Sequence, residues 1–275
     1  MTWQTTRFAI DLARPRVMAI VNVTPDSFSD GGCWPAPAQA MARCEQAVRE
    51  GRQQRGREHG DGSPPLPLAE ELARVLPVVR DAVTLGVPVS VDTYKAEVMR
   101  AVLDLGADIV NDIWALRQPG ALEAVAAHPS CGVCLMHMHG EPLTMQVAPM
   151  AGDAVPQVQA FLQGRSGALQ AAGVDAARIA WDPGIGFGKT VAQNFSLLAR
   201  QGELLASGRP LLVGWSRKSS LGAVTGDAVD DRLTASVAAA VLAVERGARI
   251  VRVHDVKETA SALKVWSAVV GQSGP

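Results

Sequence analysis

The stretch VPVSVDTYKAEVMRAVLDLGADIVNDIWALRQPGALEAVAAHPSCGVCLMHM (87–138) contains three short apolar segments separated by two longer amphipathic ones. The apolar segments cover 87–93, 108–113 and 132–138, and their apolar residues occur on both faces, with most polar residues toward the ends. Parallel strands that are covered by helices on both sides have this pattern. The stretch therefore predicts strand, helix, strand, helix and strand in that order.

The same alternation continues in both directions along the chain. Further strands are predicted at 17–23, 178–183, 210–216 and 250–256. The helices are expected at about 38–50, 68–85, 95–105, 119–128, 153–172, 191–206, 231–247 and 257–270. Regular alternation over most of 275 residues predicts an α/β fold of the (β/α)₈ TIM-barrel type, with residues 1–275 forming one domain.

One strand of the eight is not visible in the sequence. The helices at 38–50 and 68–85 have no apolar segment between them, and residues 51–63 in that gap are polar and contain no β-branched side chain. We therefore expect strand 2 and the loop after it to be atypical or missing.

Composition excludes several classes of protein. The chain is 48% hydrophobic and 19% charged, with 26 Lys and Arg against 27 Asp and Glu, so extensive disorder and binding to nucleic acid are both disfavoured. There is no run of 18 apolar residues and the first residues lack the pattern of a signal peptide, so we expect a cytoplasmic protein with no membrane span. Cys131 and Cys134 have the spacing of a metal or redox pair, but no second pair accompanies them, and free thiols are expected.

Polar side chains follow the predicted strands, at the end of a barrel where active sites are built. Asp92, Asn111 and Asp182 are short acceptors, and a carboxylate can bind the paired N–H groups of an amidine-like edge such as that of guanine or pterin. The alternative is that such residues cap the following helices, which suits Asp112 but not Asp182, because Pro and a glycine-rich loop follow Asp182. Cationic side chains near these strand ends could bind a phosphate or carboxylate group. They are Arg217, Lys218, Arg252 and His254.

Seven segments, in this order, resemble the motifs of the dihydropteroate synthase family. They are N-V-T-P-D-S-F-S-D-G-G (22–32), V-D-T-Y-K (91–95), V-N-D-I (110–113), M-H-M (136–138), W-D-P-G-I-G-F-G-K (181–189), W-S-R-K-S (215–219) and R-V-H-D-V (252–256). The resemblance implies a TIM barrel, usually a homodimer, that joins 6-hydroxymethyl-7,8-dihydropterin pyrophosphate to p-aminobenzoate in folate synthesis. The resemblance also implies a dissociative mechanism, in which pyrophosphate leaves first and the arylamine then attacks the pterin cation.

The resemblance also assigns roles to individual residues. It implies a pterin site made by Asp92, Asn111, Asp182, Lys218, Met136 and Phe187. It implies a pyrophosphate site made by Asn22, Arg252 and His254, with Asn22 near Mg²⁺, and it makes Lys218, Arg252 and His254 the catalytic group. The p-aminobenzoate site is implied to lie beside Ser219, Phe28 and Phe187, and the loop 24–32 could close over the site.

The chain departs from the family in the segment 51–63. The family has a loop of the form D-x-G-(G/A)-E-S-T-R-P-G there, whose Thr and Arg help to bind p-aminobenzoate and pyrophosphate, and this chain lacks it. Two alternatives to an active synthase therefore stay open: a pterin-binding paralogue with impaired or no activity, and a pterin-dependent methyltransferase domain. The segments W-S-R-K-S and R-V-H-D-V favour the synthase.

The segment 51–63 has two explanations, which the nucleotide sequence distinguishes. One is a local reading-frame shift: read one base later, codons for Gln53 to His59 allow Ser-Ser-Val-Asp-Val-Ser-Thr, which has strand-like residues and a Ser-Thr pair. The other is a natural variant with an irregular strand or loop. For the frame shift we expect the shifted frame of the gene to encode a segment like D-x-G…S-T-R-P-G. A shifted frame without that segment would leave only the natural variant.

Overall fold

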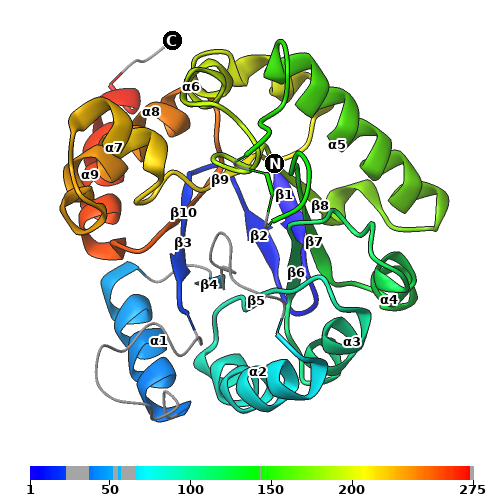
Figure 1. The fold of residues 1–275 in the computed structure, drawn as a ribbon. Helices are drawn as coiled ribbons and strands as arrows, with labels where there is room; N and C mark the ends of the chain where they lie inside the picture. Colours follow the sequence, from blue (N-terminus) through cyan, green and yellow to red (C-terminus); the bar gives the residue numbers. More distant parts are fainter. Residues whose placement is uncertain (23–36, 52–54, 57–65, 143, 146, 273–275) are drawn as a thin grey trace.

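The computed structural model describes residues 1–22, 37–51, 55–56, 66–142, 144–145 and 147–272. Within these residues, short parallel strands form the inner wall of a barrel, and helices surround them (Figure 1). The barrel strands are β3 (Arg16–Ile20), β4 (Arg55–Gly56), β5 (Ser90–Asp92), β6 (Ile109–Asp112), β7 (Gly132–Met136), β8 (Ile179–Asp182), β9 (Leu212–Val213) and β10 (Ile250–Val253). The helices are α1 (Pro37–Gly51), α2 (Leu68–Ala82), α3 (Ala96–Asp104), α4 (Ala121–Ala127), α5 (Ala154–Ala171), α6 (Val191–Ala199), α7 (Ser219–Thr225), α8 (Leu233–Glu245) and α9 (Val256–Val270).

The barrel consists of two four-stranded parallel sheets. One has the order β4-β3-β10-β9 and the other the order β5-β6-β7-β8. An isolated parallel bridge between Trp181 of β8 and Leu211, just before β9, joins them on one side. On the other side β4 lies beside β5 (Figure 1). This closed order of parallel strands with helices outside is the (β/α)₈ barrel that the sequence predicts.

The place of strand 2 is occupied, although the sequence gives no sign of a strand there. β4 pairs in parallel with β3, with Ala19 opposite Arg55 and Ile20 opposite Gly56. Of the expectation that strand 2 is atypical or missing, the second part is corrected: a strand is present at Arg55–Gly56. Pairing with β3 uses backbone groups, which explains why it does not require β-branched side chains. Residues 52–54 and 57–63 of the segment lie outside the described part of the chain.

Besides β4, a helix and a hairpin were not predicted from the sequence. The first is α7, and the second is an antiparallel hairpin of β1 (Thr2–Gln4) and β2 (Ala9–Asp11). The hairpin lies across one end of the barrel (Figure 1), and Trp3, Ile10 and Leu12 pack on inward-facing residues of the strands. The indole Nε1 of Trp3, which is fully buried, donates to the carbonyl oxygen of Arg178 at 2.8 Å. The hairpin thus closes the amino-terminal end of the barrel with apolar side chains.

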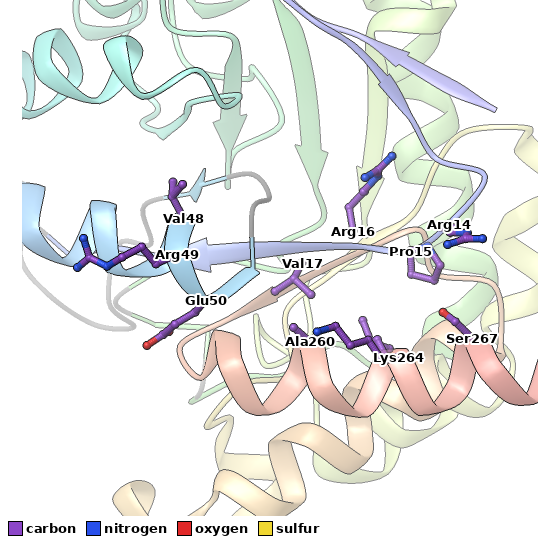
Figure 2. Close-up of a pocket in the computed structure, with 11 residues that line it drawn as sticks. Arg14, Pro15, Arg16, Val17, Val48, Arg49, Glu50, Ala260, Lys264 and Ser267 are labelled. Atoms are coloured by element: carbon purple, nitrogen blue, oxygen red, sulfur yellow. The ribbon is translucent and has the colours of Figure 1, made fainter.

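The remaining apolar side chains fill the space between the strands and the helices. Cys131 is among them, while Cys134 faces the interior of the barrel under the hairpin; both are buried and free as predicted. None of the described helices is long and apolar enough to cross a membrane. A groove of about 910 Å³ opens between α1, α9 and the start of β3, where Arg14, Arg16 and Lys264 lie (Figure 2). This groove is at the amino-terminal end of β3, far along the strand from the polar residues of the sequence motifs.

The hairpin is held to the barrel by an ion pair that can be tested. Arg7 Nη2 lies 2.6 Å from Oδ2 of Asp108, whose side chain is fully buried, and Arg7 Nε donates to Oδ1 at 3.1 Å. Arg7→Ala removes both charged hydrogen bonds, and we expect the free energy of unfolding to fall by about 2 kcal/mol in denaturant titrations. The exposed Arg14→Ala serves as the control. Equal stabilities of the two variants would contradict the role of the pair.

Candidate functional site

Four polar side chains from four strands are buried at the carboxyl end of the barrel. Asp92 (β5), Asn111 (β6), Asp182 (β8) and Arg252 (β10) are each at most 3% exposed. The register brings them together, because Asp92 pairs with Asn111 in the ladder between β5 and β6. The Asn111 amide Nδ2 donates to Asp92 Oδ2 at 3.0 Å, and Arg252 Nη1 lies 3.0 Å from Asp182 Oδ2. The structure therefore brings these four predicted residues together as two polar pairs.

The loop after β8 fixes the position of the Asp182 carboxylate. Its Oδ1 accepts a hydrogen bond from the Gly184 amide at 2.8 Å. Gly184 has φ = +67°, and a Cβ there would lie 1.8 Å from the carbonyl oxygen of His137, so only glycine fits. The Asn111 side-chain oxygen Oδ1 is buried and accepts no hydrogen bond from the described residues. A buried acceptor of this kind is expected to meet a ligand donor or a water molecule.

Apolar side chains and a lysine form one wall beside these pairs. Met136 at the end of β7 is fully buried, and it packs with Phe187 in a cluster that includes Ile113, Met138 and Met145. The ammonium of Lys218 lies 4.5 Å from the centroid of the Phe187 ring, a cation–π distance. Lys218, Phe187 and Met136 are thus neighbours, as their predicted roles in one ring pocket require.

Sequence reasoning missed Lys189, which the structure places inside this region. It is 4% exposed, and its Nζ donates to three carbonyl oxygens: His137 at 3.3 Å, Gly184 at 2.7 Å and Phe187 at 3.1 Å. Burial lowers the pKa of Lys189 to about 7, and the nearby Asp182 carboxylate opposes that shift. The only sign in the sequence was its position as the last residue of the segment W-D-P-G-I-G-F-G-K.

His254 lies just beyond the end of β10 and is hydrogen-bonded to Ser216. The Ser216 hydroxyl is 2.9 Å from His254 Nδ1 and accepts from the His254 backbone N–H at 3.1 Å. Arg217, which has φ = +60°, is turned away and forms an ion pair with Asp255 at 2.9 Å. Of the predicted cations, Arg252 thus belongs to one of the buried pairs and Lys218 lies over the Phe187 ring, while Arg217 is paired with Asp255.

Asp112 does not cap the following helix as the sequence suggested, because α4 begins at Ala121 after Gly120; it holds the turn that follows β6 instead. Its carboxylate accepts from the backbone N–H groups of Trp114 and Leu116, both at 2.8 Å, and burial raises its pKa to about 7. Asn111 and Asp112 are adjacent on one strand, so their side chains point to opposite faces. Asn111 is thereby available to the site and Asp112 is not.

The remaining predicted residues are at the rim or outside the described chain. Asn22, just after β3, and Ser219, the first residue of α7, are exposed. Phe28 and the loop 24–32 lie outside the described residues. Among the residues that the structure describes, no group of three His, Cys, Asp or Glu side chains could hold a metal ion.

Comparison with known proteins gives a family match along almost the whole chain. The family model described as pterin binding enzyme matches residues 18–254. Dihydropteroate synthase of Neisseria meningitidis serogroup B is 48% identical over 97% of both chains, and that of Escherichia coli K12 is 44% identical over 95% of this chain and 94% of its own. The chain belongs to the dihydropteroate synthase family.

Solved structures of the family share the fold. Burkholderia cenocepacia dihydropteroate synthase complexed with 7,8-dihydropteroate is 49% identical, with a TM-score of 0.90, over 99% of this chain and 97% of its own. The Yersinia pestis dihydropteroate synthase with a sulfonamide drug is 42% identical, with a TM-score of 0.93, over 98% of this chain and 100% of its own. These full-length matches favour a synthase over the methyltransferase domain that the sequence left open.

Asp182 provides a test of this site. In Asp182→Ala, the donors of a bound amidine edge would lose their charged acceptor, so we expect pterin to bind at least about tenfold more weakly, measured by calorimetry. Asp104→Ala, at an exposed position of α3, is the matched control. Circular dichroism of both variants checks the fold, because Arg252 loses its partner. Unchanged pterin affinity in folded Asp182→Ala would refute the role.

Proposed function

We propose that the carboxyl end of the barrel binds 6-hydroxymethyl-7,8-dihydropterin pyrophosphate and joins it to p-aminobenzoate, giving 7,8-dihydropteroate and pyrophosphate. The observation that carries this is the buried set Asp92, Asn111, Asp182 and Arg252, beside an apolar wall. Two carboxylates and an amide inside an apolar barrel match the donor-rich edge of a pterin ring. Met136 and Phe187 offer apolar surface to the faces of that ring.

The cations of β10 and the following loop suit the leaving group. Arg252 presents a planar guanidinium that can bind phosphate oxygens in pairs, and His254 lies two residues further on. We propose that Arg252, His254 and Lys218 stabilise the negative charge that develops on the departing pyrophosphate. His254 is oriented for this by its bonds to Ser216.

Asn22 is the residue that could hold Mg²⁺. Its amide oxygen is the type of ligand that Mg²⁺ prefers, and its exposed position at the end of β3 leaves room for water and phosphate ligands, which Mg²⁺ usually retains. One protein oxygen fits an ion bound mainly through the substrate. When bound, Mg²⁺ would neutralise part of the charge of the pyrophosphate.

The p-aminobenzoate site is proposed beside the exposed Ser219, near Lys218 and Phe187. A dihydropteroate synthase of Xanthomonas albilineans, 44% identical to this chain, has been solved with 4-aminobenzoic acid. A cation at Lys218 would attract the carboxylate end of such a molecule or steer it into the site. Phe28, the third residue assigned here by resemblance, is outside the described chain.

The reaction needs positioning more than it needs an activated protein nucleophile. The bond between the pterin methylene and the pyrophosphate oxygen breaks first, and the bonding pair leaves with the pyrophosphate. The resulting cation is delocalised into the dihydropterin ring. The amine nitrogen of p-aminobenzoate then forms the new C–N bond and loses a proton. Binding of both substrates at fixed positions supplies the main rate enhancement.

The wider setting follows from the same family. We propose that residues 1–275 act as one domain, in the cytoplasm, and that two copies associate. The free cysteines of the described chain suit a reducing compartment. The neighbouring helices α8 and α9 carry exposed apolar side chains, namely Leu242 on α8 and Val265 and Val269 on α9. Such a surface is expected to contact a second copy.

An assay of dihydropteroate formation by the purified chain tests this proposal. We expect measurable synthesis, and Arg252→Ala should weaken binding of the pterin pyrophosphate far more than binding of the same pterin without pyrophosphate. Equal losses for the two ligands would indicate a damaged fold and contradict the anion role. Pterin binding without any synthesis would identify the chain as an inactive paralogue.

A further inference from the structure

Lys189 is buried among backbone carbonyls that belong to two different segments. One acceptor is His137, at the end of β7, and the other two, Gly184 and Phe187, are in the loop between β8 and α6. An ammonium group has three donors, and here all three are used on carbonyl oxygens. Lys189 therefore ties the loop that carries Phe187 to the strand end that carries Met136.

The loop that Lys189 holds is also held by backbone hydrogen bonds, from the Met150 N–H to the Gly188 carbonyl oxygen at 2.9 Å and from the Phe187 N–H to the Gly184 carbonyl oxygen at 3.1 Å, but it contains three glycines. Gly184, Gly186 and Gly188 all have positive φ, at +67°, +85° and +66°. Three such residues within five positions give the unrestrained chain many alternative conformations. The ammonium of Lys189 restricts this freedom from inside the loop. Asn194 of α6 adds a contact from outside, because its Oδ1 accepts from the Gly186 amide at 2.9 Å.

This loop determines where two groups of the site lie. Phe187 is 4% exposed and carries the Lys218 ammonium 4.5 Å above its ring. Gly186 lies against the aliphatic part of Lys218, since a Cβ at Gly186 would be 3.3 Å from Cδ of that lysine. Displacement of the loop would therefore move Phe187 and Lys218 together. It would also change the electrostatic environment of Asp182, which attracts the charge of Lys189.

We propose that Lys189 is a positioning residue of the pterin site: it fixes the loop 184–188 through three carbonyl oxygens and thereby seats Lys218 over Phe187 for the bound pterin. Lys189 touches no reacting atom in this role. The inference deepens the proposed function, because it concerns the same pocket and rests on pterin as its ligand. This role differs from a purely structural one in one respect: Lys189 affects ligand binding by fixing the position of Lys218.

A double-mutant cycle tests this route. Lys189→Met keeps most of the side-chain volume and removes the three donors, and Lys218→Met removes the seated cation. The dissociation constant for 6-hydroxymethyl-7,8-dihydropterin pyrophosphate is measured by calorimetry, without p-aminobenzoate, for the wild type, both single variants and the double variant. Because binding alone is measured, the cycle is independent of whether the chain completes the synthase reaction. Lys264→Met, on the exposed face of α9, is the control.

We expect Lys189→Met to weaken pterin binding about tenfold, and the double variant to be no more than about threefold weaker than the worse single variant, since both act on one group. A second cycle pairs Lys189→Met with His254→Gln, at the other side of the site. There the fold-losses in affinity of the two single variants should multiply in the double variant. Factors that multiply in the Lys218 cycle, or an unchanged affinity in Lys189→Met, would overturn the proposal. If Lys189→Met does not fold, Lys189→Gln is used in its place. If neither variant folds, Lys189 serves stability alone, and this result would also overturn the proposal.

Discussion

The ion pair between Asp182 and Arg252 connects the two halves of the barrel at the point where the substrate is proposed to bind. Asp182 ends β8 of one sheet, and Arg252 belongs to β10 of the other. Both side chains are almost fully buried, at 1% and 3% exposed. Two charges out of water are tolerated only when each has a partner, so the removal of either leaves an uncompensated charge in the barrel. The positions of β8 and β10 at the carboxyl end therefore depend on each other.

The same constraint explains why a polar pocket can exist inside an apolar barrel. Asp92 accepts a hydrogen bond from the Asn111 amide and Asp182 is ion-paired with Arg252, so these side chains are already oriented before a ligand arrives. Such preorganisation reduces the free energy that binding must spend on ordering side chains. The loop 184–188 and Lys189 extend this ordered region to Phe187 and Lys218. Asn22 and Ser219, which are proposed to meet Mg²⁺ and the second substrate, are exposed at the rim.

Much of the fold was predictable because the buried parallel strands are mainly apolar on both faces, with their polar residues toward one end. All seven predicted strands are present, and the polar residues Asp92, Asn111 and Asp182 lie at strand ends as the barrel requires. β4 could not be predicted, because it is held by backbone pairing with β3 and has no strand-like side chains. The hairpin of β1 and β2 was missed because its strands have three residues each, too few to show a pattern. The role of Lys189 depends on three carbonyl oxygens, which a sequence does not display.

The most direct test of the account is a crystal structure of this chain with 6-hydroxymethyl-7,8-dihydropterin pyrophosphate bound. We predict that the amidine edge of the pterin lies within hydrogen-bond distance of Asp182, that the Asn111 side chain contacts the same ring, and that pyrophosphate oxygens contact Arg252. We also predict that the ring lies beside Phe187 and Lys218. A pterin bound outside the carboxyl end of the barrel, or inside it with no contact to Asp182, would contradict the central claim.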